Sequence, residues 1–167
     1  DCVLSGVSRG ATLGAETGFS GTVGAGMTAL LLGQRAIALS LAFGERREVD
    51  WATPEATGAA VIAALHALPW INGVCMNVNF PPVPPAQCGP LTITRQGLGR
   101  VRDIHVDTRT DPRLVDYAWL NFERGPIDDA SDSEALVVHQ QHAIAATPLS
   151  LERTNSLAYD TMRAALG

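Results

Sequence analysis

The pattern of apolar and polar positions predicts that strands and helices alternate over the first half of the chain. Residues 35–41 form a nearly continuous apolar run, which is typical of a buried parallel strand. A helix is expected between Ser20 and Gly33, because apolar residues such as Val23 and Met27 recur at steps of three and four. An apolar run near the N-terminus predicts a strand before this helix. Strand, helix and strand in this order form a right-handed crossover unit.

The same patterns predict the remaining elements. In chain order they are a helix that starts at Thr53-Pro54-Glu55 with Thr53 as its cap, a strand at 73–80, alternating strands at 91–95, 104–108 and 116–122, a short helix from Ser133 through Val138, a strand at 142–149, and a final helix from Asn155 or Ser156 to Leu166. Strict alternation is typical of antiparallel strands, so we expect antiparallel pairing for the three alternating segments. A turn at 111–113 makes a hairpin of the last two.

A proline-rich segment at 81–90 is the best candidate for an internal boundary. It holds five of the ten prolines, so it is expected to be stiff and extended. We therefore expect a single domain over 1–167, with an α/β core portion at 1–80. Residues 91–167 would add the hairpin extension, the last strand and the C-terminal helix.

Composition excludes several classes of partner. Seventeen acidic and twelve basic residues give a formal net charge of −5, and the chain has no long basic run, which argues against binding a nucleic-acid duplex. No stretch of eighteen apolar residues occurs, so we expect no membrane partner. Three cysteines without metal-ligand spacing fit a reducing cytoplasm. The N-terminus lacks a signal-peptide pattern and begins abruptly, so we expect an unexported chain that is a fragment.

The candidate binding site is the glycine-rich segment that follows the apolar residues Cys2 to Leu4. Ser20 or Gly21 can begin a helix there, and the free N–H groups of its first turn, with the hydroxyl of Thr22, would face the end of the strand. A helix N-terminus in this position attracts anions such as phosphate. Arg9 could contact the same phosphate.

Two other groups of polar residues suggest metal sites, and we interpret both as structural. His139 and His142 are three residues apart across a helix-to-strand junction, which does not bring two imidazoles onto one face. The acidic residues of 125–133 do not match the spacing of a calcium-binding loop, so a solvated turn is expected.

Several ordered motifs resemble the SurE family of survival proteins, which are metal-dependent nucleotidases. The motifs are Ser5-Gly6-Val7-x-Arg9-Gly10, Leu13-Gly14, Phe19-Ser20-Gly21-Thr22-Val23, Asn77-Val78-Asn79-Phe80-Pro81 and Thr147-Pro148-Leu149. The resemblance implies a three-layer α/β fold with a mainly parallel, Rossmann-like sheet, a projecting antiparallel hairpin and a C-terminal helix. It also implies a cytoplasmic homodimer or tetramer in which copies exchange the hairpin and that helix.

The resemblance further implies an activity and a cofactor. SurE proteins are 5'-nucleotidases that hydrolyse nucleoside monophosphates, or other phosphomonoesters, with a divalent metal such as Mg²⁺ or Mn²⁺. Ser8 stands where the family has a metal-binding Asn, and Thr12 replaces a second Asn. The family's metal-binding Asn-Asp-Asp-Gly segment, with the N-terminal βαβ portion of the fold, is missing from this sequence.

Because hard cations need several oxygen ligands, we expect this chain alone to be nearly inactive. It would then be a fragment of a SurE-like phosphohydrolase. Two alternatives remain open. One is a catalytically degenerate homologue that acts as a dimeric module for binding nucleotide or phosphate, and the other is a small-molecule-binding α/β module outside the family.

Overall fold

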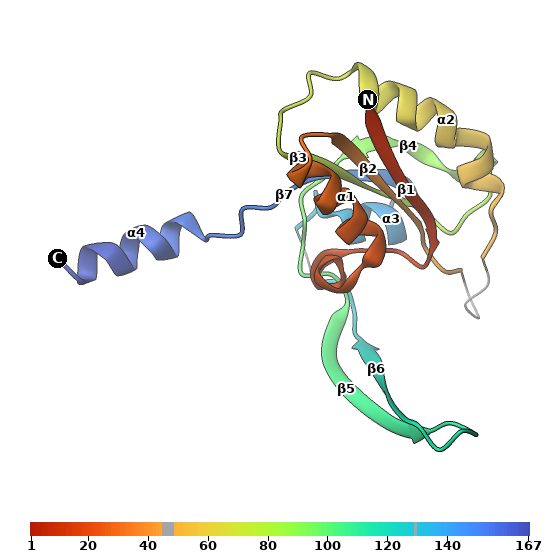
Figure 1. Cartoon of the computed structure of the whole chain (residues 1–167). Helices are drawn as coiled ribbons and strands as arrows, with labels where there is room; N and C mark the ends of the chain where they lie inside the picture. The colour runs from red at the N-terminus through yellow and green to blue at the C-terminus, as the bar shows by residue number, and fades with distance from the viewer. Residues whose placement is uncertain (45–48, 129) are drawn as a thin grey trace.

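The structure of the chain, a computed structural model, describes residues 1–44, 49–128 and 130–167. A five-stranded sheet has the order β1-β2-β3-β7-β4, and a separate two-stranded sheet pairs β5 with β6 (Figure 1). The elements are β1 (Cys2–Arg9), the 3-10 helix η1 (Gly14–Phe19), α1 (Gly21–Leu31), β2 (Arg35–Leu41), α2 (Ala52–Ala67), β3 (Val74–Phe80), the 3-10 helix η3 (Pro85–Gln87), β4 (Gly89–Ile93), β5 (Val101–Thr110), β6 (Asp116–Arg124), α3 (Glu134–His139), β7 (Ala143–Ser150) and α4 (Ser156–Ala165).

The five-stranded sheet is mainly parallel, as predicted. β1, β2 and β3 are parallel neighbours, and β7 runs antiparallel to β3. The prediction of antiparallel pairing for 91–95 is wrong, because β4 in this region runs parallel to β7. The alternating pattern reflects one covered and one exposed face of an edge strand, which both strand directions allow. The proline-rich segment 81–90 thus leads from β3 into β4 of the same sheet.

Helices cover both faces of the sheet, which gives the predicted three layers. α2 places Val61 and Leu65 against alternate sheet residues that include Ile37 and Val78. α1 packs on the opposite face through Val23 and Ala29. α3 covers the β7 end of the sheet on the same side as α1, through a cluster whose members are Leu13, Ala42, Ala135, Val137, Val138, Ala143 and Ala145.

The ends of α1 follow the predicted signals, because both depend on local chemistry. The hydroxyl of Ser20 accepts a hydrogen bond from the Val23 N–H at 3.2 Å and caps the N-terminus. Gly33 follows the C-terminus with φ +72°, a conformation that glycine adopts without steric cost. The Gln34 N–H donates to the Ala29 carbonyl at 3.0 Å, which satisfies one of the last carbonyls of the helix.

The predicted start of α2 is off by a few residues, and Thr53 is not its cap. The N-cap position is Trp51, and the Ala52 N–H is instead satisfied by the Asp50 carboxylate at 3.0 Å. Thr53 is buried and donates its hydroxyl hydrogen to the Val83 carbonyl. This bond ties the first turn of α2 to the proline-rich segment, which the local sequence does not show.

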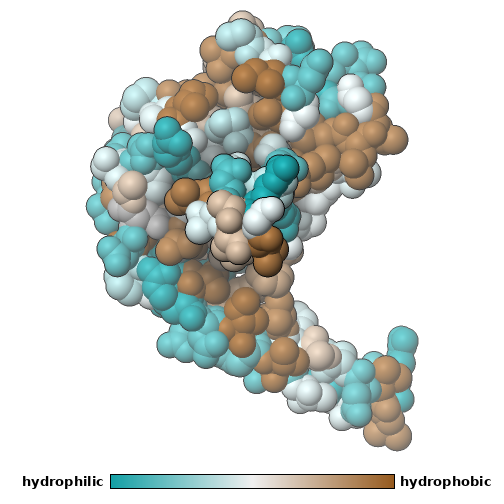
Figure 2. Space-filling view, turned by 90° about the vertical axis from the view of Figure 1, so that its left-hand side faces the viewer, coloured by the Kyte–Doolittle hydropathy of each residue, from teal (hydrophilic) through white to brown (hydrophobic). Residues whose placement is uncertain are grey.

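The β5–β6 hairpin and α4 project from the rest of the chain (Figure 1). Trp119 is 59% exposed and every residue of β5 except Val101 is exposed. α4 has no buried residue in the structure as described. Apolar side chains lie along the arm at the bottom of Figure 2, which is this hairpin. Among the described residues, no helix combines the length and apolar character needed to cross a membrane.

Candidate functional site

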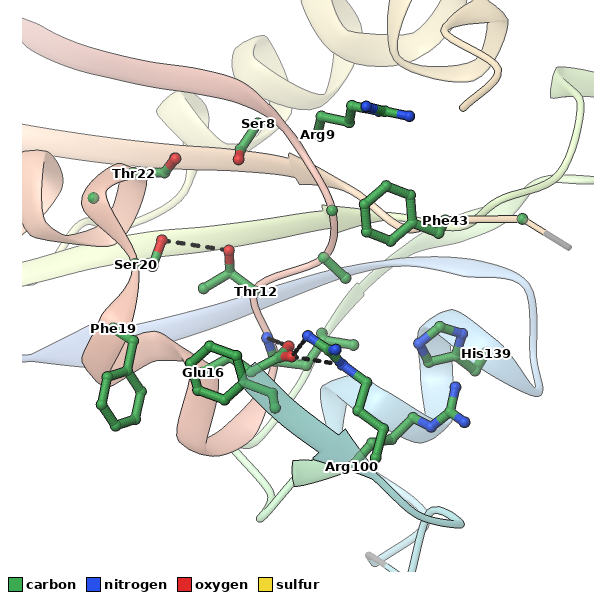
Figure 3. A pocket seen from close by; sticks show the side chains of 17 residues that line it. Ser8, Arg9, Thr12, Glu16, Phe19, Ser20, Thr22, Phe43, Arg100 and His139 are labelled. Atoms are coloured by element: carbon green, nitrogen blue, oxygen red, sulfur yellow. Dashed lines mark hydrogen bonds and ion pairs between the residues drawn. The ribbon is translucent and has the colours of Figure 1, made fainter. Parts of the chain in front are cut away.

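A cavity of about 710 Å³ lies at the carboxyl ends of β1 and β2, beside the N-terminus of α1 (Figure 3). Open α/β sheets bind ligands at this edge, because loops and helix N-termini converge there. Ser8 and Arg9 line the cavity from the end of β1, and Phe43 lines it from the segment after β2. Ser20, Gly21 and Thr22 line it from the start of α1, so the structure brings all predicted binding residues to one cavity.

The N-terminus of α1 presents donors to the cavity. In the first turn of an α-helix the backbone N–H groups lack partners within the helix. In α1 the first two of these N–H groups belong to Gly21 and Thr22. Ser20 caps the helix as predicted, because its hydroxyl oxygen accepts the Val23 N–H at 3.2 Å. The backbone N–H groups of this turn and the hydroxyls of Ser20 and Thr22 thus lie together at the cavity, where the sequence predicts the anion site.

A buried network of hydrogen bonds holds the loop before this helix against the sheet. The Asn79 Oδ1 accepts the Thr12 N–H at 2.8 Å, and the Asn79 Nδ2 donates to the Thr12 carbonyl at 3.1 Å. The Asn77 Nδ2 donates to the same carbonyl at 2.9 Å. The Thr12 hydroxyl lies 3.1 Å from the Ser40 hydroxyl and 3.4 Å from that of Ser20. The network thus links β2 and β3 to the residue that caps α1.

A second anchor of the loop is Glu134, at the start of α3. Its carboxylate is fully buried and accepts the Gly14 N–H at 2.7 Å and the Gly97 N–H at 2.9 Å. Gly14 has φ +55°, and a Cβ at this position would overlap the Leu98 backbone. Only glycine fits this conformation and this close approach. Glu134 therefore joins the glycine-rich loop to the segment that leads into β5.

The base of the hairpin forms another wall of the cavity. Arg124 of β6 is ion-paired with Glu16 of η1, with Nε 3.0 Å from the Glu16 Oε1. The rings of Phe19 and Phe122 are in edge-to-face contact, with centroids 5.4 Å apart. Arg100, which leads into β5, completes this wall. Sequence reasoning missed this wall, because nothing in the local pattern indicates that 122–124 folds back onto 16–19.

The described lining of the cavity is positively charged, although the chain carries a net charge of −5. It contains Arg9, Arg100 and Arg124 with Glu16 as the one described carboxylate. The Arg9 guanidinium lies 5.7 Å from the centroid of the Phe43 ring, which keeps it at the rim. A cavity with this charge attracts anionic ligands.

His139 also lines the cavity, and the sequence analysis gave it no role. Burial, together with the positive charges of the nearby Arg100 and His142, lowers the pKa of His139 to about 4. The imidazole is therefore neutral near pH 7 and can donate or accept one hydrogen bond. His142 is not among the described residues that line the cavity, although it lies close enough to His139 to affect its pKa.

The described residues do not fit the divalent metal that the family resemblance implies. Ser8 lines the cavity, but the one carboxylate among the described lining residues is Glu16, which is ion-paired with Arg124. Within the described ranges, no three His, Cys, Asp or Glu side chains come together in a group that could hold a metal ion. A hydroxyl with one engaged carboxylate is a poor donor set for Mg²⁺ or Mn²⁺.

Comparisons with known proteins agree with the sequence motifs. A sequence model of the family described as "Survival protein SurE" matches residues 1–103. The chain is 46% identical over 167 residues to a protein of Burkholderia lata named 5'-nucleotidase SurE 1. It is 39% identical over 170 residues to the 5'-nucleotidase SurE of Brucella canis. Both alignments cover 100% of this chain, which spans 64% and 66% of the length of these curated relatives.

The fold is also that of a solved structure. The SurE protein from Aquifex aeolicus superimposes with a TM-score of 0.75 at 24% identity, over 100% of this chain and 66% of the other. At this identity the similarity shows the fold alone. Together with the match of the family's sequence model over more than half of the residues, it establishes that the chain belongs to the SurE family.

Proposed function

We propose that this chain forms the phosphate-binding part of a 5'-nucleotidase that hydrolyses nucleoside monophosphates or other phosphomonoesters. The observation that carries the proposal is the N-terminus of α1, which opens into a positively charged cavity at the carboxyl edge of the sheet. The names of the relatives, 5'-nucleotidase SurE, support the same reaction class.

The residues of this chain bind and orient the phosphate. The N–H groups of Gly21 and Thr22 donate to its oxygens, and the partial positive charge of the helix N-terminus favours the anion. The Thr22 hydroxyl adds a further donor from the same turn. Arg9, at the rim of the cavity, contributes a guanidinium that can pair with a phosphate oxygen.

Hydrolysis as we propose it needs additional carboxylates. The family resemblance implies Mg²⁺ or Mn²⁺, with Ser8 at a ligand position, and the described residues offer a donor set too weak to hold such an ion. We therefore derive no catalytic step through a metal and assign to this chain the binding of the phosphate. The carboxylate ligands would come from residues other than those that line the cavity.

Calorimetry with inorganic phosphate and AMP, in the presence of EDTA, tests the binding site directly. Thr22→Ala should weaken both ligands by about 1–2 kcal/mol, because it removes a hydrogen bond to a charged group. Thr28→Ala is a matched control in the same helix, since the Thr28 hydroxyl donates to the Gly24 carbonyl on an exposed face. Unchanged affinity for phosphate and AMP in the Thr22 variant would rule out the proposed phosphate-binding site.

A second candidate function is a catalytically degenerate homologue that binds nucleotide or phosphate as a dimeric module. The observation that favours it is the engaged state of Glu16, which leaves the cavity without a described carboxylate pair. An assay of AMP hydrolysis with added Mg²⁺ or Mn²⁺ separates the two. Metal-dependent turnover would exclude the degenerate module.

We also propose that the protein acts in the cytoplasm as a homodimer or tetramer. The support is the projecting hairpin with exposed apolar side chains and the α4 helix with no buried described residue. Such surfaces are typical of contacts between copies.

A further inference from the structure

We infer that the aromatic pair Phe19 and Phe122, at the base of the hairpin, binds the flat ring of an aromatic phosphomonoester such as the base of a nucleotide. This inference rests on the proposed function, because it assigns the part of the cavity that a phosphate group leaves open. It makes the base of the hairpin a part of the substrate site and makes Phe19 and Phe122 specificity-determining residues.

The first observation is where the aromatic side chains lie. Three of the four phenylalanines in the chain line this one cavity, namely Phe19, Phe43 and Phe122. Phe19 is 56% exposed. An exposed aromatic face at the mouth of a cavity is a surface on which a flat ring can stack.

The second observation is the position of Phe19 relative to the phosphate site. Phe19 directly precedes Ser20, the cap of α1, and its ring lies below that residue at the wall of the cavity (Figure 3). The ester group of a phosphate bound at the N-terminus of α1 could therefore reach this wall. The cavity of about 710 Å³ has room for a ligand much larger than a phosphate.

The third observation is that the wall is held rigidly. The rings of Phe19 and Phe122 meet at 65° in an edge-to-face contact, and Phe19 nevertheless stays 56% exposed. The Arg124 guanidinium lies 5.8 Å from the centroid of Phe122 and is tied to Glu16 on the other side. A preorganised wall loses little conformational entropy when a ligand binds.

A purely structural role is the competing explanation, in which the aromatic pair only fastens the hairpin to η1. The two explanations differ in what happens to ligands that lack a ring. A structural role predicts an equal loss of affinity for every phosphate-containing ligand, because the whole cavity would be disturbed. A stacking role predicts a loss restricted to ligands with an aromatic ring.

The experiment measures the affinities of AMP, ribose 5-phosphate and inorganic phosphate for the full chain by calorimetry. We expect Phe19→Leu and Phe122→Leu each to weaken the binding of AMP about 5- to 150-fold, the range typical of single base–aromatic contacts. Ribose 5-phosphate and phosphate should change by less than about twofold. Phe19→Trp should retain the preference for AMP, because it keeps a stacking face.

The matched control is Trp119→Leu, which removes an exposed ring from the same strand as Phe122 but outside the cavity. It should leave all three affinities unchanged. Equal weakening of the three ligands in the Phe19 variant would overturn the inference in favour of a structural role.

The wild-type protein separates this inference from the proposed function. Equal affinity for AMP and ribose 5-phosphate would overturn the inference that the aromatic pair stacks on the base. It would leave the proposed phosphate-binding site unaffected. Failure to bind any of the three ligands would overturn the phosphate site itself, and the inference with it.

Discussion

The side-chain amide of Asn79 binds both backbone polar groups of Thr12. Its Oδ1 accepts the Thr12 N–H at 2.8 Å, and its Nδ2 donates to the Thr12 carbonyl at 3.1 Å. The two residues are 67 positions apart, and both are buried. The Asn79 amide thus makes the two hydrogen bonds to the Thr12 backbone that a neighbouring strand would otherwise make. The Thr12 hydroxyl in turn lies 3.4 Å from that of Ser20, so the pair sets the position of the first turn of α1.

Asn79→Ala should lower the free energy of unfolding by about 1–3 kcal/mol, because the buried Thr12 N–H loses its acceptor. Phosphate affinity should fall as well, since the loop is no longer held beside Ser20. Chemical denaturation and calorimetry measure the two effects. Asn121→Ala, which removes an exposed amide bonded to Asp107, should change neither. Wild-type stability in the Asn79 variant would contradict the role of the network.

Gly26 and Cys75 define how closely α1 approaches the sheet. A Cβ at residue 26 would lie 2.5 Å from the Cys75 Sγ, which is closer than side-chain atoms tolerate. Gly26→Ala should therefore destabilise the protein by about 1–3 kcal/mol through overpacking. Thermal or chemical denaturation measures the loss.

The double variant Gly26→Ala/Cys75→Ala provides the control for this packing effect. The Cβ of residue 26 would lie 3.8 Å from that of residue 75, an ordinary contact. The second substitution should thus recover much of the lost stability. Additive losses in the double variant would show that the clash is not the cause.

The half-buried imidazole of His139 predicts a pH dependence of stability. Its pKa in the folded protein is about 4, below the unfolded value of 6.5. Between these values the unfolded state binds a proton that the folded state does not, so stability falls as the pH drops from about 6.5 to about 4. The shift corresponds to about 3 kcal/mol over this range.

Denaturation of the wild type and of His139→Gln from pH 7.5 to pH 4 tests this prediction. The difference in unfolding free energy between the two proteins should shrink steadily below pH 6.5. His66→Gln, at an exposed position of α2, controls for the substitution itself. A constant difference across this range would rule out the buried neutral imidazole.

The exposed apolar side chains of the hairpin predict association of copies. We expect light scattering at micromolar concentration to show at least a dimer. Trp119→Asp should weaken association by about tenfold or more, because a charge in an apolar contact is costly unless it is paired. Trp51→Asp is a matched control, since Trp51 is also exposed but lies at the N-cap of α2. A monomer with native circular dichroism would contradict the expectation.

Local chemistry explains which features the sequence predicts well. Ser20 caps α1 through a bond to Val23 three residues away, and Gly33 ends the helix through its own backbone conformation. The apolar run of β2 matches a strand that is buried on both faces of the sheet. The proposed anion site at Gly21 and Thr22 depends on the same short-range features, since a helix N-terminus carries its donors in its own backbone. Family motifs add the fold, because their order spans nearly the whole chain.

Tertiary structure decides the features that depend on residues far apart in the chain. The direction of β4 is set by its neighbour β7, and alternation within 91–95 is compatible with either direction. Glu134 binds Gly14 across 120 positions, and Arg124 meets Glu16 across 108. The sequence by itself thus determined the family and most of the elements, and it placed the proposed anion site at the start of α1. Only folding determined which distant side chains complete the cavity, because such contacts leave no periodic pattern along the chain.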